Sequence, residues 1–404
     1  SGAIEQDADI VSFIFRPEYY GLTEWDDEER TPCEGQAEFI VAKHRNGGLE
    51  NIRLKFTGHL AQFSNLDDDF GNEFHSKMNS AILNLSFLLS SLFTFTSCNN
   101  EIDTPIKLQG FVFGTTYNII YYDVAVNFED DINQLFDEVN QSTSTYMYSS
   151  DISRINRGEK GVNVDKYFQE VFNKSTQIFN ETNGYFDPTV GNLVNAWGFG
   201  PEKPINNLDS SKVKELMKFV GFDKVKLVDN EIIKEHSETY FDFNSIGKGY
   251  GLDVVARFLD SKGVKNYLVE IGGEVRLKGT KPNGKLWTVQ LDDPNTDGSR
   301  SAYKKINLTN ISMASSGNYR KFRITKNGEK YVHTINPKTG FATESNLLAA
   351  TVIAELDCAD VDAYATAFMA MGFEKTKKFL QAKPNLKVVL IYVDDNGNLL
   401  EFKR

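Results

Sequence analysis

Residues 242–253 read Asp-Phe-Asn-Ser-Ile-Gly-Lys-Gly-Tyr-Gly-Leu-Asp, and within them a polar loop passes into a helix. After Gly247, Lys248 and Gly249, apolar residues recur at helical spacing. Glycines let a backbone approach a ligand closely, and a helix N-terminus favours anions. Lys248 there offers a point charge to a phosphate, although a capped helix with a solvated lysine explains the pattern equally well. The spacing matches neither of the common nucleotide-binding glycine motifs.

Helices and strands mix on both sides of this loop without a regular strand-helix-strand rhythm. Helical spacing predicts helices over 130–146, 166–182, 210–220, 249–262 and 359–371. Alternating or β-branched stretches predict strands over 110–126, 267–278, 286–291, 303–311 and 347–354, with hairpins joining 320–324 to 330–335 and 386–393 to 399–402. We therefore expect an α+β fold, with mixed sheets and flanking helices.

Polar clusters rich in Gly, Asp, Asn, Ser and Thr stand at the ends of these elements. Besides 242–250, they are Gly-Tyr-Phe-Asp-Pro-Thr-Val-Gly at 184–191, Glu-Ile-Gly-Gly-Glu at 270–274, Ser-Ser-Gly-Asn-Tyr at 315–319, His-Thr-Ile-Asn-Pro-Lys-Thr-Gly at 333–340 and Asp-Cys-Ala-Asp-Val-Asp-Ala-Tyr-Ala-Thr at 357–366.

Asp362 and Thr366 lie four residues apart on a predicted helix, so their oxygens share one face. A carboxylate and a hydroxyl are hard ligands that suit Mg²⁺, which completes its shell with waters and substrate phosphates. The alternative is an aspartate that complements the helix dipole.

His333 is the best candidate for general acid-base work, because three of the other histidines precede residue 78 and His236 lies in a charged turn. A structural histidine is the alternative.

Read in order, the six clusters resemble the ApbE family, the FAD:protein FMN transferases. The resemblance covers residues 110–404 and extends upstream through Gly-Thr-Thr-Tyr at 114–117 and Ser-Thr-Tyr at 144–146. It implies an α+β enzyme that moves FMN from FAD to a Thr or Ser hydroxyl of an acceptor protein, releases AMP and needs Mg²⁺.

The resemblance also implies roles for individual residues. His333 matches the catalytic histidine, and the metal ligands match Asp362, Thr366 and a backbone oxygen of the 244–247 turn, assigned to Gly247. The FAD contacts match Phe113, Tyr146, Phe186, Asp187, Asp242, Lys248 and Ile335. Phe113 stands where the family usually has Met, and Gly247 where it often has Ala.

The acidity of the chain is concentrated in its first part. Residues 1–77 carry 16 acidic and 7 basic residues, whereas the other 327 carry 40 and 37. Neither part has the basic stripe that a nucleic-acid backbone requires, so we expect no nucleic-acid partner.

Residues 78–98 resemble a lipoprotein signal peptide. Residues 81–95 are mostly apolar, which is too short for a membrane span but suits a signal-peptide core. Small residues then precede Cys98, the predicted site of lipidation; a buried core helix with an inert cysteine is the alternative. We expect residues 99–109 to be a tether to the 110–404 domain.

Residues 1–77 resemble the C-terminal end of the motor domain of a DnaB-type replicative helicase, through 1–10, 13–20 and 42–47. No phosphate-binding loop precedes them, and a few strands of a parallel sheet cannot bury both faces. We interpret them as a remnant without helicase activity that precedes a start at Met78.

These resemblances imply a lipid-anchored enzyme of the bacterial cell envelope that faces the periplasm. The expected partners are FAD, the membrane and a subunit of a membrane redox complex. The alternatives are a Mg²⁺-dependent FAD pyrophosphatase, which needs the same pocket, and an FAD-binding lipoprotein without turnover.

Overall fold

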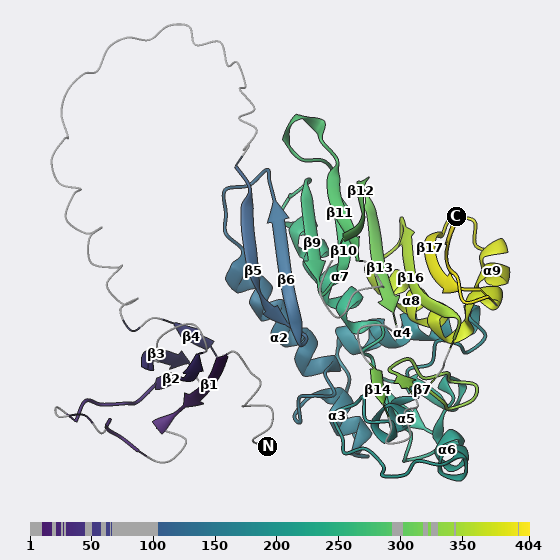
Figure 1. Ribbon diagram of the computed structural model, residues 1–404, viewed down its shortest axis with the longest axis horizontal. Helices are drawn as coiled ribbons and strands as arrows, with labels where there is room; N and C mark the ends of the chain where they lie inside the picture. The colour runs from purple at the N-terminus through teal and green to yellow at the C-terminus, as the bar shows by residue number, and fades with distance from the viewer. Residues whose placement is uncertain are drawn as a thin grey trace, which may run out of the picture. The chain divides into compact units, whose positions relative to one another are not determined.

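The computed structural model of this chain divides into two compact units, Ser1–Thr96 and Ser97–Arg404 (Figure 1). It describes residues 10–17, 22–25, 27, 30–44, 51–57, 62–64, 66, 104–292, 302–317, 322–324, 330–342, 345–394 and 396–404. The predicted signal peptide, Cys98 and the first five residues of the predicted tether lie outside these ranges. No helix within them is both long enough and apolar enough to cross a membrane.

The first unit holds a four-stranded sheet in the order β1-β2-β3-β4, in which neighbouring strands are antiparallel. Its strands are β1 (Ile10–Phe15), β2 (Gln36–His44), β3 (Asn51–Thr57) and β4 (Gln62–Ser64). The expectation of strands from a parallel sheet was wrong for this part. The links from β2 to β3 and from β3 to β4 are too short for a parallel crossover, which needs a dozen or more residues.

An eight-stranded antiparallel sheet forms the centre of the second unit, in the order β18-β17-β16-β13-β10-β9-β6-β5. Every second residue of β9 is buried, whereas β16 is buried on both faces. The strands are β5 (Ile106–Val112), β6 (Thr115–Tyr121), β9 (Tyr267–Ile271), β10 (Glu274–Lys278), β13 (Ile311–Gly317), β16 (Leu347–Ala354), β17 (Lys387–Val393) and β18 (Leu399–Lys403).

Helices cover one face of this sheet and a hairpin covers the other (Figure 1). The helices are α2 (Glu129–Thr143), α4 (Lys166–Glu181), α7 (Gly247–Ser261), α8 (Cys358–Met371) and α9 (Phe373–Gln381). On the opposite face, β11 (Trp287–Asp292) and β12 (Ala302–Leu308) pack Trp287 against Val275 and Met313. The domain therefore has three layers, with its largest core between α7, α8 and the sheet.

A smaller cluster of elements lies beside the helix layer. It contains α3 (Asp151–Asn156), α5 (Gly191–Ala196), α6 (Ser210–Leu216), the hairpin β7 (Val225–Val228) to β8 (Glu231–Lys234) and the hairpin β14 (Phe322–Ile324) to β15 (Lys330–Val332). Leu193, Val213, Val220, Ile335 and Ala342 form its own small core.

The predicted α+β class is confirmed, but three of the predicted strands, 110–126, 267–278 and 303–311, each run across a turn between two strands. Residues 110–126 form the end of one hairpin strand and the whole of the next, because Phe113 and Gly114 turn the chain with positive φ values of 50° and 74°. Gly272 and Gly273 divide 267–278 in the same way. A pattern of alternating residues continues across such tight turns, so it does not reveal them. Strand β5 also begins at Ile106, inside the predicted tether.

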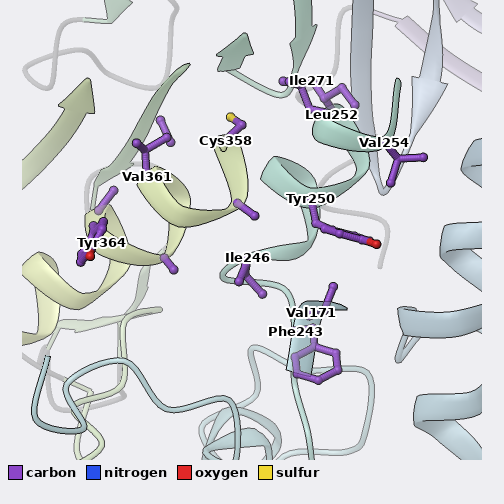
Figure 2. Packing of buried hydrophobic residues seen from close by; sticks show 14 of the residues in the cluster. Val171, Phe243, Ile246, Tyr250, Leu252, Val254, Ile271, Cys358, Val361 and Tyr364 are labelled. Carbon is purple, nitrogen blue, oxygen red and sulfur yellow. The ribbon is translucent and has the colours of Figure 1, made fainter. Parts of the chain in front are cut away.

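Helices α7 and α8 lie side by side (Figure 2), and glycines of α7 allow its neighbours to approach closely. A Cβ atom on Gly249 would lie 2.5 Å from the backbone oxygen of Cys358 in α8, and one on Gly251 would lie 2.2 Å from the ring of Phe113. A Cβ on Gly247 would meet nothing within 4 Å. Open space next to the backbone is therefore found at Gly247, whereas Gly249 and Gly251 are required for packing.

Candidate functional site

A lysine and two buried carboxylates meet where α7 begins. Lys248 occupies the second position of α7, and its Nζ atom lies 3.1 Å from Oε1 of Glu274 and 3.8 Å from Oδ2 of Asp362. The side chains of Glu274 and Asp362 are only 4% and 3% exposed, while that of Lys248 is 29% exposed. Residues from three separate parts of the sequence thus form one charged cluster with an outlet to solvent at the lysine.

Burial controls the ionisation of this cluster. It raises the pKa of Glu274 and of Asp362, and Lys248 opposes the rise in both. Burial alone would lower the pKa of Lys248, but the attraction of Asp362 and Glu274 raises it above its usual value. With both carboxylates ionised, two negative charges face one positive charge. A net negative charge in a buried place is costly, and either a bound proton or a further cation reduces it.

Asp362 and Thr366 lie on the same face of α8, as their spacing predicted. Oδ2 of Asp362 accepts the backbone N–H of Gly249 at 3.2 Å, and the hydroxyl of Thr366 lies 3.3 Å from that of Ser316 in β13. Within the described ranges, no three His, Cys, Asp or Glu side chains are grouped as metal ligands. One carboxylate, one hydroxyl and the open backbone at Gly247 still fit Mg²⁺, which takes most of its oxygens from water and phosphates.

The loops at 184–191 and 240–244 are hydrogen-bonded to each other. The N–H of Asp242 donates to the carbonyl oxygen of Pro188 at 2.8 Å, and the N–H of Gly191 donates to that of Tyr240 at 3.2 Å. Partial burial and the negative charge of Asp242 raise the pKa of Tyr146, which is 64% exposed. The predicted contacts Tyr146 and Asp242 are therefore neighbours.

Asp187 uses its carboxylate to support its own loop. Oδ1 accepts the N–H and the hydroxyl of Thr189 at 2.8 and 2.6 Å, and Oδ2 accepts the N–H of Phe222 at 3.3 Å. Burial raises its pKa to about 6 despite these bonds. The ring of Phe186 is 1% exposed in the main core. Both predicted contacts are thus buried, and their side chains shape the loop from inside the protein.

The loop at 333–340 lies against both neighbouring parts of the site. Asn336 Nδ2 donates to the carbonyl oxygen of Ala370, one turn of α8 beyond Thr366, at 3.5 Å. The Nζ atom of Lys338 would touch a Cβ on Gly184. His333 is half-buried with its ring 6.5 Å from that of Phe199, in an edge-to-face arrangement. Ile335 is 6% exposed and packs in the small core beside α5.

Phe113 packs against α7. Its ring lies over Gly251 and 5.6 Å from the ring of Phe136, and it is half-buried. Its positive φ is uncommon for a bulky residue, and such strain is often found at functional sites. The structure therefore packs the Phe113 ring against α7 and α2 and leaves the residue half-buried.

Three residues of the site had no assigned role in the sequence. Glu274 faces Lys248, Ser316 faces Thr366, and Asp253 accepts the backbone N–H groups of Cys358 and Ala359, both at 2.8 Å, at the start of α8. Glu274 and Ser316 belong to two of the polar clusters, and Asp253 ends the 242–253 stretch, which was the available signal. Their partners are 26 to 106 residues away, so only the folded chain identifies their contacts.

A shallow cavity of about 340 Å³ lies near the last turn of α7, the opposite end from Lys248. Arg276 and Asp357 line it, and Arg276 is already paired with Asp357 and Asp253. None of the predicted site residues lines this cavity, so we do not assign it to the same ligand.

The fold and the site define an α+β domain in which a lysine and two buried carboxylates meet at a helix N-terminus. Residues 113–390 match the family model described as the ApbE family. This match spans more than half of the chain, and the chain therefore belongs to the ApbE family. Residues 1–65 match a second model, described as the DnaB-like helicase C terminal domain, which confirms that resemblance.

Individual relatives agree with this assignment. An FAD:protein FMN transferase of Haemophilus influenzae is 35% identical over 335 residues, covering 80% of this chain and 94% of its own length. One from Vibrio cholerae is 33% identical over 317 residues, covering 76% and 93%. The solved flavin transferase ApbE from Vibrio cholerae superimposes with a TM-score of 0.67 at 33% identity, covering 74% of this chain and 97% of that one. The apo flavinyl transferase ApbE of Pseudomonas stutzeri gives 0.66 at 25% identity.

Proposed function

We propose that this chain transfers the FMN part of FAD to a Thr or Ser hydroxyl of an acceptor protein and releases AMP. The observation that carries the proposal is the meeting of Lys248, Glu274 and Asp362 at the N-terminus of α7. It lies in a domain whose relatives above 30% identity are named FAD:protein FMN transferases. FAD is therefore the substrate, and a second protein is the acceptor.

Lys248 and the first turn of α7 bind the diphosphate of FAD in this proposal. The ammonium group supplies a positive charge, and the helix N-terminus supplies backbone N–H groups and the positive end of its dipole. Tyr146 and the adjoining loops at 184–191 and 240–244 hold the rest of the dinucleotide. Positioning of the reacting groups accounts for much of the rate in phosphoryl transfers.

Asp362, Thr366 and a carbonyl oxygen of the 244–247 turn would hold Mg²⁺. When bound, the ion spreads the negative charge that develops on the diphosphate. Asp362 has a second task, because it also anchors the backbone of Gly249. Cation binding and the position of α7 are thereby linked.

His333 is the general base of the proposed reaction. The acceptor hydroxyl oxygen forms a bond to the phosphorus of the FMN half, and the bond from that phosphorus to the bridging oxygen breaks, so that this oxygen leaves on AMP. The electron pair leaves with AMP, and the hydroxyl proton passes to His333. The ring lies on the same loop as Asn336, which contacts α8 one turn beyond Thr366.

The test is incubation of the full chain with FAD, Mg²⁺ and a candidate acceptor subunit, followed by intact mass measurement of the acceptor. We expect an acceptor that gains FMN, with an equal amount of AMP released. His333→Ala should abolish transfer while FAD binding persists, and His236→Ala, in an exposed turn, should behave as wild type. Rapid AMP release without acceptor labelling would identify an FAD pyrophosphatase instead.

The proposal includes a location. Lipidation of Cys98 would tether the domain to the bacterial cell envelope on its periplasmic side, near a subunit of a membrane electron-transport complex. Residues 1–77 would then play no part in flavin transfer. Metabolic labelling with a fatty acid tests this: the wild-type chain should be labelled and Cys98→Ser should not. Label that persists in Cys98→Ser would contradict the assignment.

A further inference from the structure

Glu274 is placed in the site by an unusual turn. Gly272 and Gly273, both with positive φ, reverse the chain between β9 and β10, and Glu274 is the first residue after them. Non-glycine residues rarely adopt such angles, so the Gly-Gly pair determines where the strand restarts. The side chain of Glu274 is thereby buried against the start of α7, 4% exposed.

The carboxylate of Glu274 is only half satisfied by the protein. Oε1 contacts Lys248, but Oε2 is buried without a hydrogen-bond partner among the described residues. Asp253, equally buried, shows the contrast: Oδ1 accepts the N–H of Cys358 and Oδ2 that of Ala359, with Arg276 paired as well. A buried carboxylate that only supports the fold is expected to pair both oxygens. Glu274 therefore has another task.

The ammonium group of Lys248 lies closer to Glu274 than to Asp362. Its distance to Glu274 is 3.1 Å and its distance to Asp362 is 3.8 Å. Lys174, also between two carboxylates, lies 2.9 Å from Asp357 and 3.0 Å from Asp360. Lys248 is thus held back from Asp362, and Glu274 is the group that holds it.

We propose that Glu274 is a positioning residue that keeps the ammonium group of Lys248 off Asp362. Asp362 then stays open to a cation, and Lys248 stays directed at the diphosphate. The inference rests on the proposed function, because it assigns these two partners from FAD and Mg²⁺. Without Glu274, Asp362 would be the one ion-pair partner left to Lys248 among the described residues, and Lys248 would close onto it.

Direct binding separates this role from a simple effect of charge. FAD binding to the full chain is measured by flavin fluorescence in EDTA, so that no divalent cation takes part. If Glu274 acted only through its charge, Glu274→Gln would tighten FAD binding by removing repulsion from the diphosphate. If it positions Lys248, Glu274→Gln weakens FAD binding by about fivefold or more, the value of one charge-assisted contact.

The dependence on Lys248 completes the test. Lys248→Met should weaken FAD binding by about tenfold in the wild-type background, but by less than about twofold when Glu274→Gln is already present. Glu274→Asp, whose carboxylate is one methylene shorter, should weaken binding in the same direction and serves if Glu274→Gln does not fold. Glu374→Gln removes the same charge from the exposed side of α9 and should match wild type.

Two results would overturn the inference: FAD binding by Glu274→Gln that equals or exceeds that of wild type, or the same loss from Lys248→Met in both backgrounds. Either could occur in a protein that still transfers FMN, which leaves the proposed function intact. A folded wild-type chain that does not bind FAD would instead overturn the proposed function, and this inference with it.

Discussion

Oδ2 of Asp362 accepts a hydrogen bond from the backbone N–H of Gly249 at 3.2 Å, although the two residues lie 113 positions apart in the sequence. This bond joins the first turn of α7 to the middle of α8. Lys248 stands beside one end of it and Thr366 stands one turn beyond the other. The relative positions of the proposed anion and cation sites therefore depend on how closely these two helices pack.

Alanine at position 249 should disrupt that packing. The new Cβ would meet backbone atoms of Cys358, which cannot move aside as a side chain can, so Gly249→Ala should destabilise the fold by about 1–3 kcal/mol. Gly247→Ala is the matched control, because its Cβ meets nothing within 4 Å and its stability should stay within about 1 kcal/mol. Urea unfolding of both variants provides the comparison; equal stabilities would show that the helices are less tightly packed than described.

Removal of the Asp362 carboxylate should abolish the response to Mg²⁺. Asp362→Ala removes the one carboxylate among the proposed cation ligands, so transfer should fall by about 100-fold or more and stop responding to added Mg²⁺. Asp360→Asn, on the same helix but paired with Lys174, should keep its Mg²⁺ dependence. Full transfer activity of wild type in excess EDTA would count against the cation site itself.

Ser316 should orient the hydroxyl of Thr366. A hydroxyl that gives a lone pair to a cation directs its hydrogen elsewhere, and Ser316 lies 3.3 Å away to accept it. Ser316→Ala should raise the Mg²⁺ concentration for half-maximal transfer by about tenfold, at little cost to the melting temperature. Ser315→Ala is the control, since Ser315 pairs with Thr351 instead. Equal Mg²⁺ curves for both variants would contradict this role.

Asp253 should be required for the stability of α8. It caps the first N–H groups of that helix from α7, and the N-cap residue Asp357 forms no such side-chain bond. Asp253→Asn turns one acceptor into a donor that faces an N–H group, which should cost about 1–3 kcal/mol of unfolding free energy. Chemical denaturation measures the loss. A variant as stable as wild type would mean that the cap is dispensable.

The stability contribution of Asp187 should depend on pH. Its pKa of about 6 in the folded protein exceeds the value of 3.8 for an unperturbed group, so the folded state binds the proton more tightly. The contribution of this group is therefore largest below about pH 4 and is lost as the pH rises through 6, by about 2–3 kcal/mol. Asp187→Asn does not titrate. Its deficit relative to wild type should thus shrink from pH 4 to pH 7, and a constant deficit would contradict the assignment.

Much of the site could be anticipated from residue types and spacing. The position of Lys248 at the start of a helix, and the shared face of Asp362 and Thr366, follow from local periodicity and are present in α7 and α8. The assignment of functional loops was also local, because each loop is rich in residues that favour turns. The local pattern did not reveal the turn at Gly272 and Gly273. It therefore did not reveal that Glu274 lies in the site.

The sequence by itself determined the α+β class and which residues lie in polar loops. It also determined that Lys248, Asp362 and Thr366 lie on helices. These properties depend on interactions within about four residues, which spacing encodes directly. Only the tertiary structure decided that Gly249 and Gly251 serve packing, that Asp187 and Phe186 are buried, and that Glu274 pairs with Lys248. Those outcomes depend on contacts between distant segments, where burial and close packing select the partner.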